Sequence, residues 1–170
     1  IIEISEDAGI TLDFLVSDYN GYEISCDDGN DGYIELNING GSSPYSINWE
    51  GPNGFYSNSE DIYNLSSGYY TMYLTDLNGC EASINLTLSE PEELQITIDE
   101  IPEICGTGGS TSIQVYGGTQ PMNYNWSGPN NFTSNNGDLS SLESGSYELE
   151  VSDANNCLVY ENTTIEYIEG

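Results

Sequence analysis

Hydrophobic and polar residues alternate along several short runs of the chain, and this period of two predicts β-strands. In residues 32–40, Ile34, Leu36 and Ile38 face one way and the residues between them face the other. Residues 44–51 and 67–76 alternate in the same manner. No stretch shows a helical period, so the pattern predicts an all-β chain.

The chain repeats itself. Residues 40–80 align with residues 117–157 without a gap, and 19 of these 41 positions are identical. The identical pairs, each 77 residues apart, include Gly40/Gly117, Pro44/Pro121, Trp49/Trp126, Phe55/Phe132, Leu65/Leu142, Gly68/Gly145, Tyr70/Tyr147, Asp76/Asp153 and Cys80/Cys157. We interpret this as a tandem duplication.

Each copy has the spacing of a small sandwich. Short strands separated by Gly, Pro and Asn turns, about seven per copy, predict two tandem immunoglobulin-like β-sandwich repeats. The expected limits are 10–90 for repeat 1 and 91–170 for repeat 2. Residues 1–9 resemble the segment that joins the copies, so we expect the end of a preceding repeat or a linker there, within a longer array.

All side-chain charge is negative. The chain has 29 acidic residues and no Lys, Arg or His, which gives a formal charge of −29. Nucleic-acid binding is excluded, because phosphates are neutralised by Lys and Arg. Anionic membranes would repel the chain, and no apolar run is long enough to insert into one. Without His or Lys the sequence favours a protein that is not an enzyme.

The four cysteines fit the repeat. Cys26 and Cys80 stand 54 positions apart, and Cys105 and Cys157 stand 52 apart. Pairing within each copy respects the duplication, and closing such loops stabilises a small domain by roughly 4 kcal/mol. Four buried free thiols are the alternative. Disulfides predict an extracellular protein, and Trp49 and Trp126 are expected in the core near them.

The repeat resembles a known family. The motifs "GGSSPYSINW" and "LSSGYYTMYLTDLNGC" of copy one, preceded by Cys26, are similar to the SprB-type repeats of surface adhesins from gliding Bacteroidetes. Copy two departs at Met122 and Asn156. The resemblance implies export by type IX secretion, display at the outer surface, and adhesion or gliding motility, with no catalytic residue. A looser resemblance is to polycystic-kidney-disease-like repeats of immunoglobulin fold.

Two acidic segments are candidates for calcium, which prefers carboxylate and carbonyl oxygens. Asp27, Asp28 and Asp31 lie in one Gly-rich turn, and Glu90, Glu92 and Glu93 lie between the copies. Solvated acidic turns are the alternative, because the first segment does not follow the EF-hand order and copy two has no carboxylate at its equivalent.

Tyr33, Tyr69 and Tyr73 fall on the polar side of their strands, where copy two has Ser110, Ser146 and Glu150. Exposed tyrosines can stack on a sugar ring or anchor a partner. Ordinary surface packing is the alternative.

These observations predict a non-enzymatic structural and display repeat of a large, secreted cell-surface adhesin. A carbohydrate-binding or partner-binding module is the alternative. The expected partners are neighbouring repeats of the same chain and an extracellular polysaccharide or surface.

Overall fold

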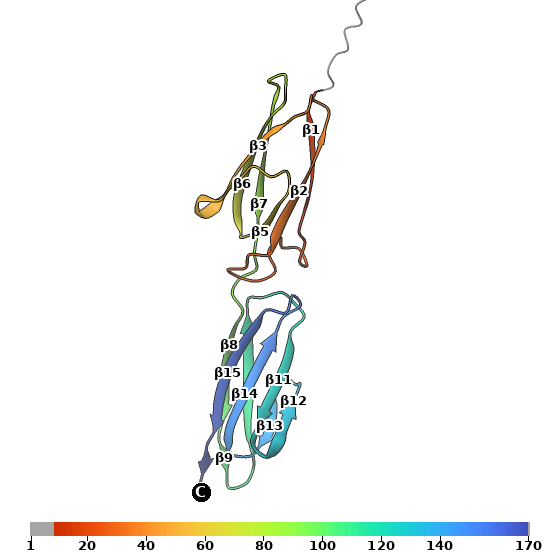
Figure 1. The fold of residues 1–170 in the computed structure, drawn as a ribbon. Helices are drawn as coiled ribbons and strands as arrows, with labels where there is room; N and C mark the ends of the chain where they lie inside the picture. The colour runs from red at the N-terminus through yellow and green to blue at the C-terminus, as the bar shows by residue number, and fades with distance from the viewer. Residues whose placement is uncertain (1–8, 170) are drawn as a thin grey trace, which may run out of the picture. The chain divides into compact units, whose positions relative to one another are not determined.

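The computed structural model describes residues 9–169 of the 170-residue chain, and Figure 1 labels its strands. The chain divides into two compact units, Ile1–Glu90 and Pro91–Gly170. Of the N-terminal segment 1–9 only Gly9 is described, so the expected end of a preceding repeat lies outside the described residues.

Unit 1 consists of two antiparallel sheets, ordered β1-β2-β5 and β4-β3-β6-β7. A single 3₁₀ turn, η1 (Pro52–Gly54), joins β3 to β4. The strands are β1 (Thr11–Val16), β2 (Gly32–Asn39), β3 (Ser46–Glu50), β4 (Tyr56–Ser57), β5 (Ile62–Leu65), β6 (Gly68–Thr75) and β7 (Glu81–Leu88).

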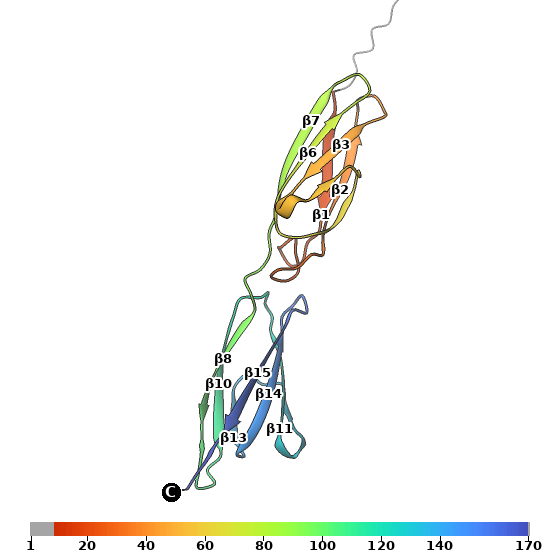
Figure 2. The same cartoon turned by 60° about the vertical axis from the view of Figure 1, so that its left-hand side comes forward.

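Unit 2 repeats this arrangement with sheets ordered β8-β10-β13 and β12-β11-β14-β15, and Figure 2 shows β8 and β10 in one layer and β11 and β14 in the other. A short parallel pair, β9 with β16, is added to it. The elements are β8 (Gln95–Ile101), β9 (Glu103–Ile104), β10 (Gly109–Tyr116), β11 (Asn123–Gly128), η2 (Pro129–Asn131), β12 (Phe132–Ser134), β13 (Leu139–Leu142), β14 (Gly145–Ser152), β15 (Leu158–Ile165) and β16 (Tyr167–Ile168).

The strand order within each unit is that of an immunoglobulin sandwich. In unit 1, β1, β2 and β5 form one sheet, and β3, β6 and β7 form the other with the short β4 at its edge. In unit 2, β8, β10 and β13 form one sheet, and β11, β14 and β15 form the other with the short β12 at its edge. The predictions of an all-β chain and of immunoglobulin-like sandwiches are therefore confirmed. Within residues 9–169 the structure holds no helix with the length and apolar character needed to cross a membrane.

The core of each unit lies between its two sheets, where the alternation of the sequence places it. In unit 1 Trp49, Met72 and Ile34 are completely buried. In unit 2 Trp126 and Val151 are completely buried too. Both tryptophans thus lie in the core, as predicted.

A buried tyrosine fixes the entrance to the sixth strand in each unit. The Tyr70 hydroxyl donates a hydrogen bond to the Ser66 carbonyl at 2.9 Å, and the Tyr147 hydroxyl donates to the Glu143 carbonyl at the same distance. This is the tyrosine corner of immunoglobulin-like domains.

The glycine of the repeated Gly-Pro-Asn turn leaves room for the ring of the corner tyrosine. A Cβ on Gly51 would lie 2.6 Å from the Tyr70 ring, so a larger residue cannot fit. Gly128 makes the same close approach to Tyr147.

Tyr70→Phe should lower the free energy of unfolding of unit 1 by about 1 kcal/mol, because it removes one buried hydrogen bond and keeps the ring. Chemical denaturation followed by tryptophan fluorescence measures this loss. Tyr63→Phe is the control: Tyr63 is 51% exposed, so we expect a change within about 0.5 kcal/mol. Equal losses in both variants would contradict a special role for the corner.

Candidate functional site

Two of the predicted tyrosines share the outer face of the four-stranded sheet of unit 1. Tyr69 and Tyr73 both lie on β6 and are 57% and 50% exposed. They stand four positions apart along the strand, which corresponds to roughly 13 Å. Both rings are therefore available to one extended ligand.

The residues around these rings are polar. Tyr73 stands opposite Asn48 on β3 and Ser83 on β7, and Tyr69 stands opposite Thr87. A cavity of about 360 Å³ lies beside Tyr73 and is lined also by Leu74, Thr75, Glu81, Ala82 and Ser83. The face thus combines aromatic rings with amide, hydroxyl and carboxylate groups.

Tyr56 belongs to the same face, although the alternation of the sequence gives no sign of it. It is 62% exposed on β4 and pairs with Glu50, whose side chain points outward because Trp49 points inward. Its strand is only two residues long and follows a turn, so alternation gives no signal there. The pairing of β4 with β3 is what places Tyr56 on the same sheet as Tyr69 and Tyr73.

Tyr33 lies elsewhere. It is on β2, in the three-stranded sheet, and its ring lies 6.2 Å from that of Tyr63. The Tyr63 hydroxyl in turn donates to the Glu35 carboxylate at 3.3 Å. The three predicted tyrosines are therefore divided between two sheets and do not form one surface.

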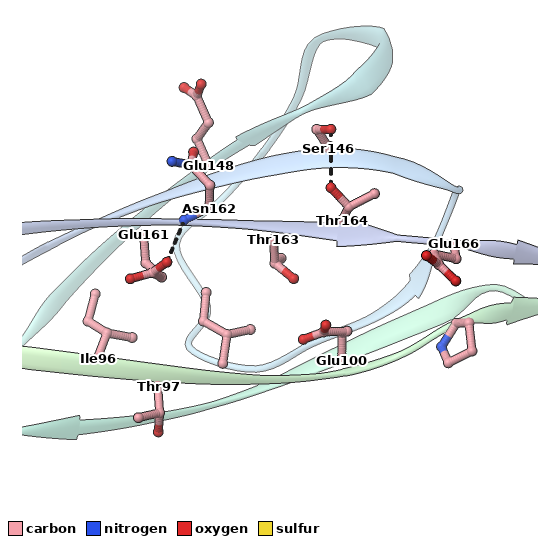
Figure 3. Close-up of a pocket in the computed structure, with 12 residues that line it drawn as sticks. Ile96, Thr97, Glu100, Ser146, Glu148, Glu161, Asn162, Thr163, Thr164 and Glu166 are labelled. Atoms are coloured by element: carbon pink, nitrogen blue, oxygen red, sulfur yellow. Dashed lines mark hydrogen bonds between the residues drawn. The ribbon is translucent and has the colours of Figure 1, made fainter.

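Unit 2 has an acidic groove between β8 and β15, of about 1060 Å³ (Figure 3). Glu100 of β8 and Glu161 and Thr163 of β15 point into the space between these strands. The residues 77 positions before Glu161 and Thr163 are Ile84 and Leu86, which pack against the core of unit 1. The groove is therefore a feature of unit 2.

The predicted calcium ligands do not converge. Within residues 9–169 no group of three or more acidic or cysteine side chains is placed to hold a metal ion. Asp31 instead accepts a hydrogen bond from the Ser25 backbone N–H at 3.1 Å, and Asp28 is exposed.

The remaining candidates for calcium are equally dispersed. Asp27 is exposed in the loop between β1 and β2. Glu92 and Glu93 are exposed, and Glu90 is partly buried. Calcium binding at either acidic segment stays a prediction.

A buried aspartate closes the hairpin between the last two long strands of each unit. Asp76 is 6% exposed and accepts hydrogen bonds from the backbone N–H groups of Ser42, Asn78 and Cys80 at 2.8–2.9 Å. These N–H groups, that of Cys80 most strongly, hold the pKa of Asp76 below its ordinary value against the opposing effect of burial. Asp153 makes the same three bonds in unit 2, to Thr119, Asn155 and Cys157.

The predicted disulfides within each repeat are wrong. Cys80 and Cys105 are free and exposed, whereas Cys26 and Cys157 are disulfide-bonded. Since each unit has one free cysteine and one bonded cysteine, neither bonded cysteine is joined to the other cysteine of its own unit. Because these two predicted disulfides do not form, the expectation that each lies beside a core tryptophan is wrong as well.

The reason is the length of the last strand. In unit 1 Cys80 directly precedes β7. The loop that holds Cys26 is bound to the other end of β7, where the Ile24 N–H donates to the Ser89 carbonyl at 3.0 Å. Figure 1 shows this loop and the β6–β7 turn at opposite ends of unit 1. Eight residues of strand span roughly 26 Å, whereas a disulfide requires Cα atoms within about 7 Å.

Unit 2 has the same arrangement. Cys157 precedes β15, and Cys105 lies beyond the other end of that strand, where its N–H donates to the Ile168 carbonyl at 3.4 Å. We refer to Cys80 and Cys157 as the turn cysteines, and to Cys26 and Cys105 as the loop cysteines.

Comparison with known proteins gives structural likeness only. No protein-family model matches the chain, and no curated protein matches it. The N-terminal eight Ig domains of Down Syndrome Cell Adhesion Molecule align over 95% of this chain and 25% of theirs, at 12% identity and a TM-score of 0.49. This chain thus spans a quarter of that protein's solved length.

Two further solved structures are similar to a lesser degree. The amphioxus IgVJ-C2 molecule aligns over 84% of this chain and 99% of its own, at 16% identity and a TM-score of 0.42. Murine CEACAM1b aligns over 83% and 94%, at 12% identity and a TM-score of 0.35. Likeness at this level transfers no function, because unrelated functions share this fold.

Asp76→Asn should remove part of the acid sensitivity of unit 1. A lowered carboxyl pKa contributes stability that is fully present above the ordinary value of about 3.9 and is lost as pH falls through the folded-state pKa. Melting temperatures measured across the acid range should therefore differ most between wild type and variant near neutral pH and converge at low pH.

Glu60→Gln is the control, because Glu60 is an exposed carboxylate between β4 and β5. Its melting temperature should follow that of the wild type at every pH. A constant difference between wild type and Asp76→Asn down to the lowest pH would contradict the proposed role of the ionised carboxylate.

Proposed function

We propose that the chain is a non-enzymatic display module of an extracellular cell-surface protein that acts in adhesion. The observation that carries this proposal is that the two units are alike inside and different outside. Their buried tryptophans, corner tyrosines and turn aspartates are the same. Their outward positions differ, with Tyr69 and Tyr73 replaced by Ser146 and Glu150.

This division is what a display scaffold requires. The buried set holds the two sheets together and is fixed by packing, which tolerates little change in volume. The outer faces make no contribution to that packing, so they are free to differ between copies. A binding surface can change there without loss of the fold.

Disulfide bonding supports the extracellular location, because such bonds persist in oxidising compartments. The SprB-type motifs of copy one support a finer proposal, in which the module belongs to a gliding-motility adhesin exported by type IX secretion. The charge of −29 supports a role in which copies of the chain stay soluble and apart.

Replacing Tyr69 and Tyr73 together by their unit 2 counterparts, Tyr69→Ser with Tyr73→Glu, should leave the melting temperature within about 4 °C of wild type, since surface substitutions change stability little. Differential scanning calorimetry measures this. The matched control is Tyr70→Ala in the core, for which we expect a clear loss of stability. A double variant that melts as early as Tyr70→Ala would contradict the scaffold proposal.

The outer face of unit 1 favours a second candidate function, the binding of a neutral polysaccharide. Tyr69 and Tyr73 can stack on the apolar faces of sugar rings, while the exposed Ser83 and Thr87 offer hydrogen bonds to hydroxyl groups. Acidic polysaccharides are disfavoured, because every charged side chain of the protein would repel them.

Tyr73→Ala should abolish binding to a neutral glycan on an array and Tyr69→Ala should weaken it, because each variant removes a stacking surface. The control is Tyr63→Ala, which removes an equally exposed ring from the other sheet and should bind as wild type does. Binding should also persist in roughly 1 M salt, where charge interactions are screened within about 3 Å.

Two results would contradict the carbohydrate proposal. One is an array on which wild type binds no neutral glycan, and the other is equal loss of binding in Tyr63→Ala and Tyr73→Ala. Either would leave the display scaffold unaffected.

A further inference from the structure

The four cysteines occupy two structural positions, and each position occurs once bonded and once free. Of the turn cysteines, Cys157 is disulfide-bonded and Cys80 is free. Of the loop cysteines, Cys26 is disulfide-bonded and Cys105 is free. The free thiols therefore occupy positions at which the other copy of the same repeat forms a disulfide.

Local structure does not distinguish the free turn cysteine from the bonded one. The Cys80 N–H donates to the Asp76 carboxylate at 2.8 Å, and the Cys157 N–H donates to that of Asp153 at 2.9 Å. Each also accepts at its carbonyl from the N–H of the same aspartate, at 2.9 and 3.1 Å. The backbone that positions the thiol is thus the same in both units.

The partner of a free thiol has to lie outside its own unit. The two cysteine positions of a unit stand at opposite ends of its last long strand, roughly 26 Å apart. Each thiol is exposed at one end of its sandwich, so it can reach only a group presented beyond that end.

We propose that Cys80 and Cys105 are linking thiols, through which the turn cysteine of one copy forms a disulfide with the loop cysteine of another copy, head to tail. The partner is a second copy of this module. One turn cysteine and one loop cysteine are already bonded, and one of each is free. A bond between Cys80 of one copy and Cys105 of another therefore uses the two thiols that remain. Such bonds would join successive modules of an array covalently at their ends.

The reaction is thiol–disulfide exchange and needs a disulfide oxidant such as oxidised glutathione. The Cys80 thiolate attacks one sulfur of the oxidant, forms a mixed disulfide and releases one glutathione thiolate. The Cys105 thiolate of the second copy then attacks the Cys80 sulfur and releases the second glutathione. Two protein thiols lose two protons and two electrons, and one oxidised glutathione is reduced to two thiols.

The bond would act against the repulsion between copies. Each chain has a formal charge of −29, so two chains repel each other strongly at low ionic strength. Non-covalent association is therefore disfavoured, and a covalent link at the module ends holds neighbours together without an apolar interface. High salt, which screens this repulsion, should speed the formation of the link.

The proposal goes beyond the display function, and two complementary variants of the full chain test it. Cys80→Ser keeps only the free loop thiol, and Cys105→Ser keeps only the free turn thiol. Each variant is incubated alone, and then mixed with the other, in oxidised glutathione and roughly 1 M salt. Non-reducing electrophoresis measures the fraction of disulfide-linked dimer.

We expect the mixture to form a dimer and each variant alone to remain mostly monomeric, with the dimer lost on reduction. Wild type should form a ladder of higher species, because it has both thiols. Mass spectrometry should find Cys80 joined to Cys105 in peptides made with a glutamate-specific protease, since the chain offers trypsin no Lys or Arg. Circular dichroism of both variants confirms that each is folded.

Two outcomes would overturn the proposal. Dimers formed as readily by each variant alone as by the mixture would show unselective oxidation of exposed thiols. Folded variants that form no dimer in the mixture would show that the turn and loop thiols do not meet. Neither outcome bears on glycan binding or on the stability of the outer-face variant, so failure here is distinguishable from failure of the proposed function.

Discussion

Every side-chain charge in this protein is negative, and this constraint explains how its polar interactions are built. With 29 carboxylates and no Lys, Arg or His, no two side chains can form an ion pair. A buried carboxylate must then be satisfied by hydrogen-bond donors, and backbone N–H groups are the most abundant ones. Asp76 and Asp153 each use three such groups, and the half-buried Asp61 accepts one, from the Leu36 N–H at 2.9 Å.

The same constraint separates the inside of each sandwich from its outside. The other carboxylates stay in water, on outer faces and at open edges, as Glu100 does in the acidic groove of unit 2. Stability then depends on apolar burial around Trp49 and Trp126 and on a few fixed hydrogen bonds such as the tyrosine corners. The repeat preserves those residues, while outward positions such as Tyr73 and Glu150 differ between the copies.

Cysteine chemistry follows the same geometry. A small sandwich is often held by a disulfide across its core, which is why pairing within each repeat is a reasonable expectation. Here the cysteines lie at the ends of the last strand, where a bond cannot cross-link the two sheets. Their position at the ends suits connection between modules, and the aspartate turn beside each turn cysteine fixes the backbone there.

The sequence by itself determined the longer strands and the core, because alternation with period two shows which side chains face inward. Ile34, Trp49 and Tyr70 could be assigned to the interior from that pattern alone. The sequence alone could not determine which exposed residues share a surface. Tyr33 and Tyr73 look equivalent in sequence, but the division of strands between two sheets separates them, and the pairing of β4 with β3 places Tyr56 on the sheet of Tyr73.

The cysteine pairing was also decided by the tertiary structure alone. Spacing in sequence measures the length of the chain between two thiols, whereas a disulfide depends on their distance in space. Because an extended strand lies between the turn cysteine and the loop cysteine of each unit, the two thiols are kept far apart in space.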